Sequence, residues 1–103
     1  MSDKYKIIYS PLAADDLHSI YRFFNETHKE KSVATQAIDA IHTLIPLLEH
    51  TPKTFEIFKK TTCLLELRKL PTSYFDIFYY IDTENNVVKI VRILHSGKDI
   101  NAI

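Results

Sequence analysis

Three stretches in the second half of the chain repeat their apolar side chains with a period of two, which is typical of β-strands. They cover residues 63–70, 75–82 and 87–94. Pro71-Thr72-Ser73 separates the first two, and the polar cluster 82–86 separates the last two. Because both connections are short and rich in turn-forming residues, the pattern predicts three successive antiparallel strands.

The middle strand of this meander carries large side chains on both faces. Phe75, Ile77 and Tyr79 should point to one face, and Phe78 and Tyr80 to the other. We expect the helices of the domain to cover one face. The other face is covered by the segment 53–60, or it is left as an apolar patch that binds a partner; the sequence leaves both alternatives open.

The chain before the meander begins with a short strand and a helix. Residues 5–9 alternate as a half-buried strand, and Ser10-Pro11 ends it and starts the helix. Ser10 suits the N-cap, Pro11 suits the first turn, and Asp15 and Asp16 lie near the positive end of the helix dipole. One apolar stripe carries this helix to about residue 25. Its members are Ala13, Leu17, Ile20, Tyr21 and Phe24.

A second apolar stripe, from Ala34 to Leu48, predicts a second helix after a polar turn at 27–31. Pro46 should kink or end this helix, because proline lacks the amide hydrogen and clashes with the preceding turn. Residues 53–60 have poor periodicity and form a loop or one irregular strand. The order β-α-α-β-β-β predicts one α+β domain over residues 1–103, in which a helical hairpin packs on an antiparallel-dominated sheet.

Charge and composition narrow the function classes. Thirteen Lys and Arg balance thirteen Asp and Glu, which argues against a protein that binds mainly by neutralising many phosphates, although a local cationic patch stays possible. No leader peptide or membrane-spanning run is visible, so we expect a cytoplasmic protein without a membrane partner. The single cysteine, Cys63, suits a small buried hydrophobe, and His18, His28, His42 and His50 show no close ligand pairing with cysteine or carboxylate. No metal or other cofactor is therefore expected.

Four motifs, taken in order, resemble the RelE/ParE superfamily of toxins over almost the whole chain. They are S-P-x-A-x-x-D-L at 10–17, L-R-K-L-P at 67–71, Y-x-x-I-F-Y at 74–79 and R-I-L-H-S-G-K-D at 92–99. The resemblance implies the toxin half of a bacterial type II toxin-antitoxin module, of the kind often called a plasmid stabilisation protein. It also implies a cognate antitoxin that wraps the toxin in a hetero-oligomer.

The superfamily has two branches with different targets. RelE-like toxins cleave mRNA on the ribosome without a metal, whereas ParE-like toxins bind DNA gyrase. Asp76 stands where RelE-like nucleases carry an arginine on the middle strand, and a carboxylate there would repel a phosphate. The chain ends Asn101-Ala102-Ile103, without the C-terminal tyrosine of several such nucleases. These differences favour gyrase inhibition; an mRNA interferase is the alternative, and an inactive homologue that binds only its antitoxin is the second.

Candidate site residues follow from each branch. In the nuclease alternative, the resemblance implies a catalytic cluster of Arg68, His95 and Lys98, since fixed cations and a proton donor or acceptor are what metal-free RNA cleavage needs. Arg68 could equally pair with Glu66 or Asp76 on the sheet. His95, at a strand end, could equally be an ordinary hydrogen-bonding residue.

Two binding surfaces complete the hypothesis. For the cellular target we expect contacts from the terminal segment 96–103 and from four cations, Lys59, Lys60, Arg92 and Lys98. For the antitoxin we expect an amphipathic segment to lie on apolar area around four aromatic side chains. These are Phe55, Phe58, Phe78 and Tyr80.

Overall fold

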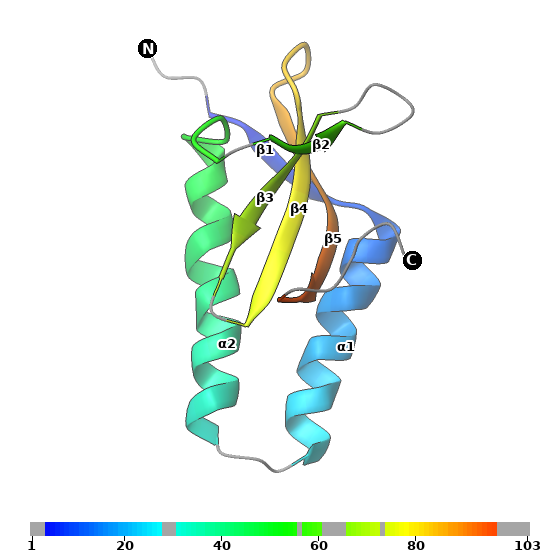
Figure 1. The fold of residues 1–103 in the computed structure, drawn as a ribbon, viewed down its shortest axis with the longest axis vertical. Helices are drawn as coiled ribbons and strands as arrows, with labels where there is room; N and C mark the ends of the chain where they lie inside the picture. The colour runs from blue at the N-terminus through cyan, green and yellow to red at the C-terminus, as the bar shows by residue number, and fades with distance from the viewer. Residues whose placement is uncertain (1–3, 28–30, 56, 61–65, 73, 97–103) are drawn as a thin grey trace.

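The computed structural model describes residues 4–27, 31–55, 57–60, 66–72 and 74–96, and two helices pack on one face of a five-stranded sheet (Figure 1). The predicted α+β two-layer fold is confirmed. The elements in chain order are β1 (Lys6–Tyr9), α1 (Pro11–Thr27), α2 (Lys31–Leu44), the 3-10 helix η1 (Ile45–Glu49), β2 (Ile57–Lys60), β3 (Glu66–Pro71), β4 (Phe75–Asp82) and β5 (Val87–His95).

The strand order in the sheet is β1-β5-β4-β3-β2. Strands β3, β4 and β5 form the predicted antiparallel meander. Strand β1 pairs with β5 in parallel, from Lys6 opposite Val87 to Tyr9 opposite Ile90, and the sequence pattern did not predict this pairing. The segment 53–60 contains the irregular strand β2, whose register with β3 shifts between Ile57 and Lys59.

The helix ends have local causes that the sequence predicts. The Ala13 amide donates to Ser10 Oγ at 3.0 Å, so the predicted N-cap of α1 is confirmed. Helix α2 stops at Leu44, two residues before Pro46, and continues as the tighter η1. The proline therefore ends the α-helix as expected. No helix among the described residues is both long enough and apolar enough to cross a membrane.

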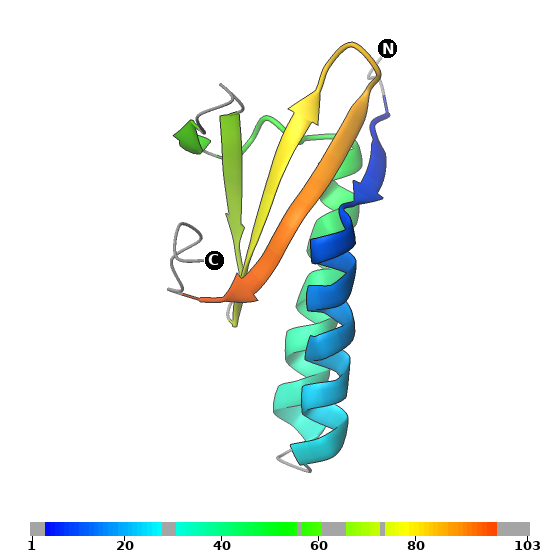
Figure 2. The same cartoon turned by 90° about the vertical axis from the view of Figure 1, so that its right-hand side faces the viewer.

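The core lies between the sheet and the helical hairpin, which runs along one side of the sheet and extends beyond it (Figure 2). Its largest members from the sheet are Phe75, Ile77 and Tyr79 on β4, which the alternation assigns to one face. The helices and the 3-10 helix contribute Ala13, Ile20, Ile41, Ile45 and Leu48.

The opposite face of β4 is also closed. The Phe78 side chain is only 1% exposed, so no open apolar patch includes this residue. Its cover does not come from residues 53–55, which Arg68 binds on the other face of the sheet. Tyr80, two residues further, is partly exposed. Burial of Phe78 removes it from any surface that the isolated chain could offer to a partner.

Candidate functional site

Helix α1 and strand β5 are joined by one carboxylate. Asp16 Oδ2 accepts a hydrogen bond from Arg92 Nε at 2.7 Å, and Asp16 Oδ1 accepts one from Arg92 Nη2 at 2.9 Å. The same Oδ2 accepts the Ile93 backbone N–H at 3.0 Å. These hydrogen bonds raise the pKa of Arg92 above its ordinary value. Both side chains are largely buried, so the pair is shielded from solvent screening.

Beyond the point where β1 stops pairing with β5, the side chains of Ser10 and Asp16 form hydrogen bonds with the backbone of β5. The last backbone bond between the two segments runs from the Ser10 amide to the Ile90 carbonyl, at 2.9 Å. Ser10 Oγ then donates to the Val91 carbonyl at 2.8 Å, and Asp16 accepts from Ile93. Side chains therefore bond two backbone groups of β5, Val91 C=O and Ile93 N–H, beyond its pairing with β1.

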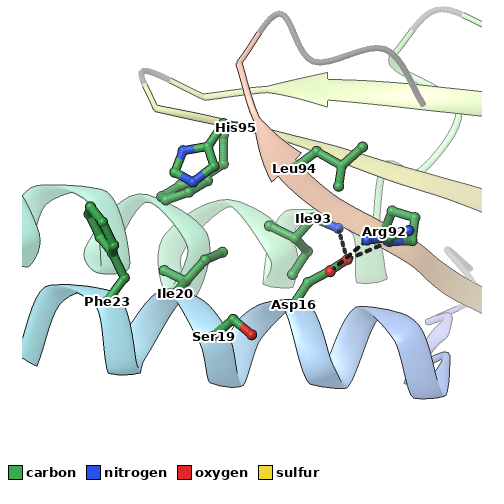
Figure 3. Close-up of a pocket in the computed structure, with 9 residues that line it drawn as sticks. Asp16, Ser19, Ile20, Phe23, Arg92, Ile93, Leu94 and His95 are labelled. Atoms are coloured by element: carbon green, nitrogen blue, oxygen red, sulfur yellow. Dashed lines mark hydrogen bonds and ion pairs between the residues drawn. The ribbon is translucent and has the colours of Figure 1, made fainter. Parts of the chain in front are cut away.

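A groove of about 270 Å³ opens between α1 and the end of β5. Asp16, Ser19, Ile20 and Phe23 line it from α1, and residues 92–95 line it from β5 (Figure 3). Phe75 of β4 is the remaining lining residue. The paired Asp16 and Arg92 form one end, where their charges largely cancel. The rest of the lining is mainly apolar, which favours contact with apolar side chains of a partner.

His95 stands at the aromatic end of this groove. Its ring lies edge-on to Phe23 of α1, with centroids 6.3 Å apart, and tilted against Phe75 of β4 at 5.1 Å. The imidazole is exposed. The distances are those of ordinary aromatic contacts. The rings are inclined to one another, and Phe23 and His95 are exposed at this end of the groove whereas Phe75 is buried.

Arg68 and Tyr79 hold the segment that leads into β2. Arg68 Nη1 donates to the Phe55 carbonyl at 2.6 Å and to that of Lys53 at 3.4 Å, while Tyr79 Oη donates to the Pro52 carbonyl at 2.6 Å. The two side chains are cross-strand neighbours on β3 and β4. Burial raises the pKa of Tyr79 to about 12, although the positive charge of Arg68 acts in the opposite direction.

Lys69, not Arg68, pairs with the acidic residue of the middle strand. Lys69 Nζ lies 3.5 Å from Asp76 Oδ2, and Asp76 is 3% exposed. The expectation that Arg68 pairs with Glu66 or Asp76 is therefore wrong for Asp76. Neighbouring residues on a strand point to opposite faces, so Lys69 faces Asp76 across one side of the sheet while Arg68 faces the segment 52–55 on the other.

The other predicted site residues are scattered. Phe55 packs against the core under the helices and so lies on the opposite side of the sheet from Phe78. Arg92 is held by Asp16. The side chains of Phe58, Lys59 and Lys60 and all of Lys98 and the segment 97–103 lie outside the described residues. Of the proposed catalytic cluster, Arg68 and His95 can be placed: Arg68 contacts the segment before β2, and His95 contacts the groove beside α1. Among the described residues, no three potential metal ligands cluster.

The family model for the ParE toxin of the type II toxin-antitoxin system parDE matches residues 7–100. The chain belongs to this ParE toxin family. It is thus a toxin of a type II toxin-antitoxin system within the wider RelE/ParE group. No match was found among curated protein sequences.

Solved structures of toxin-antitoxin complexes share the fold of this toxin. The chromosomal ParDE system of Pseudomonas aeruginosa matches with a TM-score of 0.67 and 18% identity, covering 91% of this chain and 98% of that one. The RelBE2 complex of Mycobacterium tuberculosis matches with a TM-score of 0.61 and 18% identity over 89% and 98%. The archaeal RelE-RelB complex of Pyrococcus horikoshii OT3 matches with 0.58 and 16% over 96% and 100%.

Sequence reasoning missed the groove of this ParE family toxin. It assigned Asp16 to the helix dipole, whereas the carboxylate binds β5. Phe23 lies outside the buried stripe predicted for α1, and the sequence pattern assigned no role to this apolar residue. A signal was present, because Leu12, Asp16, Ser19 and Phe23 recur at the spacing of one helix face, and large apolar residues mark both ends of that face.

Proposed function

We propose that this toxin inhibits DNA gyrase by binding to it, and that a cognate antitoxin neutralises the toxin in a hetero-oligomer. The observation that carries the choice of target is the environment of Asp76. It is a buried carboxylate paired with Lys69, at the position where the nuclease branch carries an arginine. A buried ion pair at this position offers no net positive charge that could stabilise a scissile phosphate.

The contacts of Arg68 and Arg92 also support gyrase rather than mRNA as the target. Arg92 is bound by Asp16, and Arg68 donates to backbone carbonyls. Fixed cations that stabilise a phosphoryl transition state must point at the reacting oxygens, and these two guanidiniums point at other parts of the chain. Binding to a protein target requires no such cluster.

Induced expression in bacteria, without antitoxin, tests the proposal. Thymidine and methionine incorporation are followed over the first minutes, and expression is verified by immunoblot. Early loss of thymidine incorporation with continued translation supports gyrase inhibition. Purified toxin should then also inhibit DNA supercoiling by gyrase in vitro.

Two variants separate the proposal from the nuclease alternative. Arg68→Ala and His95→Ala should each abolish mRNA cleavage if these residues are catalytic, whereas the exposed Arg22→Ala on α1 serves as the matched control. Circular dichroism checks that each variant is folded. Early loss of translation that both variants relieve would overturn gyrase inhibition in favour of an mRNA interferase. Harmless expression of the folded chain would overturn it in favour of an inactive homologue.

A further inference from the structure

Strand β1 stands first in the sheet order β1-β5-β4-β3-β2, so a neighbouring strand pairs with it on one side only (Figure 2). The amides of Lys6 and Ser10 both donate to backbone carbonyls of the segment 86–90, so the even-numbered residues of β1 face β5. The backbone groups of successive residues on a strand point to opposite edges. Those of Ile7 and Tyr9 therefore point away from β5.

The open part of this edge is short and has defined limits. Within the part of the chain that the structure describes, neither the N–H nor the C=O of Ile7 and Tyr9 has a hydrogen-bond partner. Two residues before them, the Tyr5 amide already donates to the Glu49 carbonyl at 2.8 Å. Two residues after them, Pro11 has no amide hydrogen. The edge therefore offers two donors and two acceptors between a closed position and a proline.

Apolar side chains lie on both faces of this edge. Ile7 packs against the core, and Tyr9 on the same face is 38% exposed. Ile8 points to the opposite face and is partly exposed. An edge strand with unpaired backbone groups and apolar side chains is a template for pairing with another chain.

We propose that β1 pairs in an antiparallel manner with β1 of a second copy of this toxin, about a two-fold axis through Ile8. In this register Ile7 lies opposite Tyr9 of the second copy, and every open N–H and C=O of both residues forms a hydrogen bond. Ile8 lies opposite Ile8, and Lys6 lies opposite Ser10. Apolar pairs thus form on both faces, and no like charges meet directly.

The neighbouring registers fit less well. An axis through Ile7 would place Tyr9 opposite Tyr5, whose amide is already bonded to η1. An axis through Tyr9 would place Ile7 opposite Pro11, which cannot donate. The axis through Ile8 uses all the open groups and places Pro11 opposite Tyr5, where neither residue has an amide hydrogen to offer.

This match of the edge to itself favours a second copy over an unrelated strand, because a two-fold interface requires one surface to be self-complementary. The interface is small, of the class that forms transient complexes. The association is a property of the toxin alone and goes beyond the proposed inhibition of gyrase.

A charge exchange at the two-fold axis tests the proposal on the full-length toxin. In Ile8→Lys and in Ile8→Glu, like charges would lie directly opposite each other, so each variant alone should dimerise about fivefold or more weakly than the wild type. An equimolar mixture of the two should recover the association, because opposite charges then meet across the axis. Sedimentation equilibrium measures the three cases, and circular dichroism checks that each variant is folded.

Leu47→Lys and Leu47→Glu are the matched controls, because Leu47 is an exposed apolar residue that lies on η1 instead of β1. Neither should change the dimerisation constant by more than about twofold, and their mixture should gain nothing. Equal effects at positions 8 and 47 would contradict an axis through Ile8.

Hydrogen exchange of the unaltered toxin gives a second test that needs no variant. As the toxin concentration rises, the amides of Ile7 and Tyr9 should become protected. The amides of Lys6 and Ile8, which face β5 within each copy, should not change. This contrast between neighbouring residues is specific to pairing at the outer edge of β1.

Each failure has its own signature. A toxin that stays monomeric up to about 1 mM overturns the proposal. Association without protection of Ile7 and Tyr9, or without recovery in the mixture, places the interface elsewhere and also overturns it. Protection that appears only when another protein is added shows that a foreign segment occupies the edge, and the proposal fails. None of these results bears on gyrase inhibition, which the supercoiling assay measures separately.

Discussion

Asp16 on α1 and Arg92 on β5, 76 positions apart in the chain, form a two-point ion pair with N–O distances of 2.7 and 2.9 Å. The same carboxylate accepts the Ile93 amide. One short side chain therefore connects the first helix to the edge of the last strand and fixes the wall of the groove. Geometry of this kind is specific, because the planar guanidinium fits a carboxylate along two parallel hydrogen bonds.

Replacing Asp16 by Asn should destabilise the toxin by about 2 to 4 kcal/mol. The variant keeps the shape of the side chain but leaves the largely buried Arg92 without its counter-charge, and a buried charge without a partner is costly. Urea unfolding measures the change. Asp15→Asn, an exposed neighbour on the same helix, should stay within about 0.5 kcal/mol of the wild type; a comparable loss there would show that the helix dipole rather than the ion pair is responsible.

Replacing Ser10 by Ala should cost about 1 to 2 kcal/mol, because two hydrogen bonds depend on one hydroxyl. Ser10 Oγ accepts from the Ala13 amide and donates to the Val91 carbonyl. Hydrogen exchange should also accelerate at the first turn of α1. Ser19→Ala, on the exposed surface of the same helix, provides the control, and an equal loss of stability in both variants would refute the capping explanation.

The stability of the toxin should fall between about pH 10 and pH 12 through Tyr79. The pKa of this phenol is raised from 10.0 to about 12 in the folded chain. In that interval the unfolded chain releases the proton while the folded chain retains it, so the free energy of unfolding decreases as pH rises. Below pH 10 both states are protonated and the contribution is fully present.

Tyr79→Phe isolates this contribution. The variant lacks the titrating hydroxyl and its hydrogen bond to the Pro52 carbonyl, so it should be less stable at neutral pH and lose stability less steeply above pH 10. Denaturant unfolding of both proteins across this range gives the difference, in which the other tyrosines and the lysines cancel. Parallel curves for the two proteins would mean that Tyr79 does not carry the alkaline loss.

Local sequence determined the elements of this protein. Period-two alternation predicts β3, β4 and β5, and the Ser10-Pro11 pair predicts the start of α1, because strand pleats and helix caps depend on residues a few positions apart. Pro46 likewise predicts the end of α2. The motif order also predicts the toxin family, which the match over residues 7–100 bears out.

Only the tertiary structure decided which of these elements meet. The parallel pairing of β1 with β5, the ion pair of Asp16 with Arg92, and the ties from Arg68 to the segment before β2 all join residues far apart in the chain. A periodic pattern shows which side of an element is buried, but it carries no information about the partner across the core. Asp16 therefore fits the helix dipole equally well in sequence, and its true contact depends on how α1 crosses the open edge of β5.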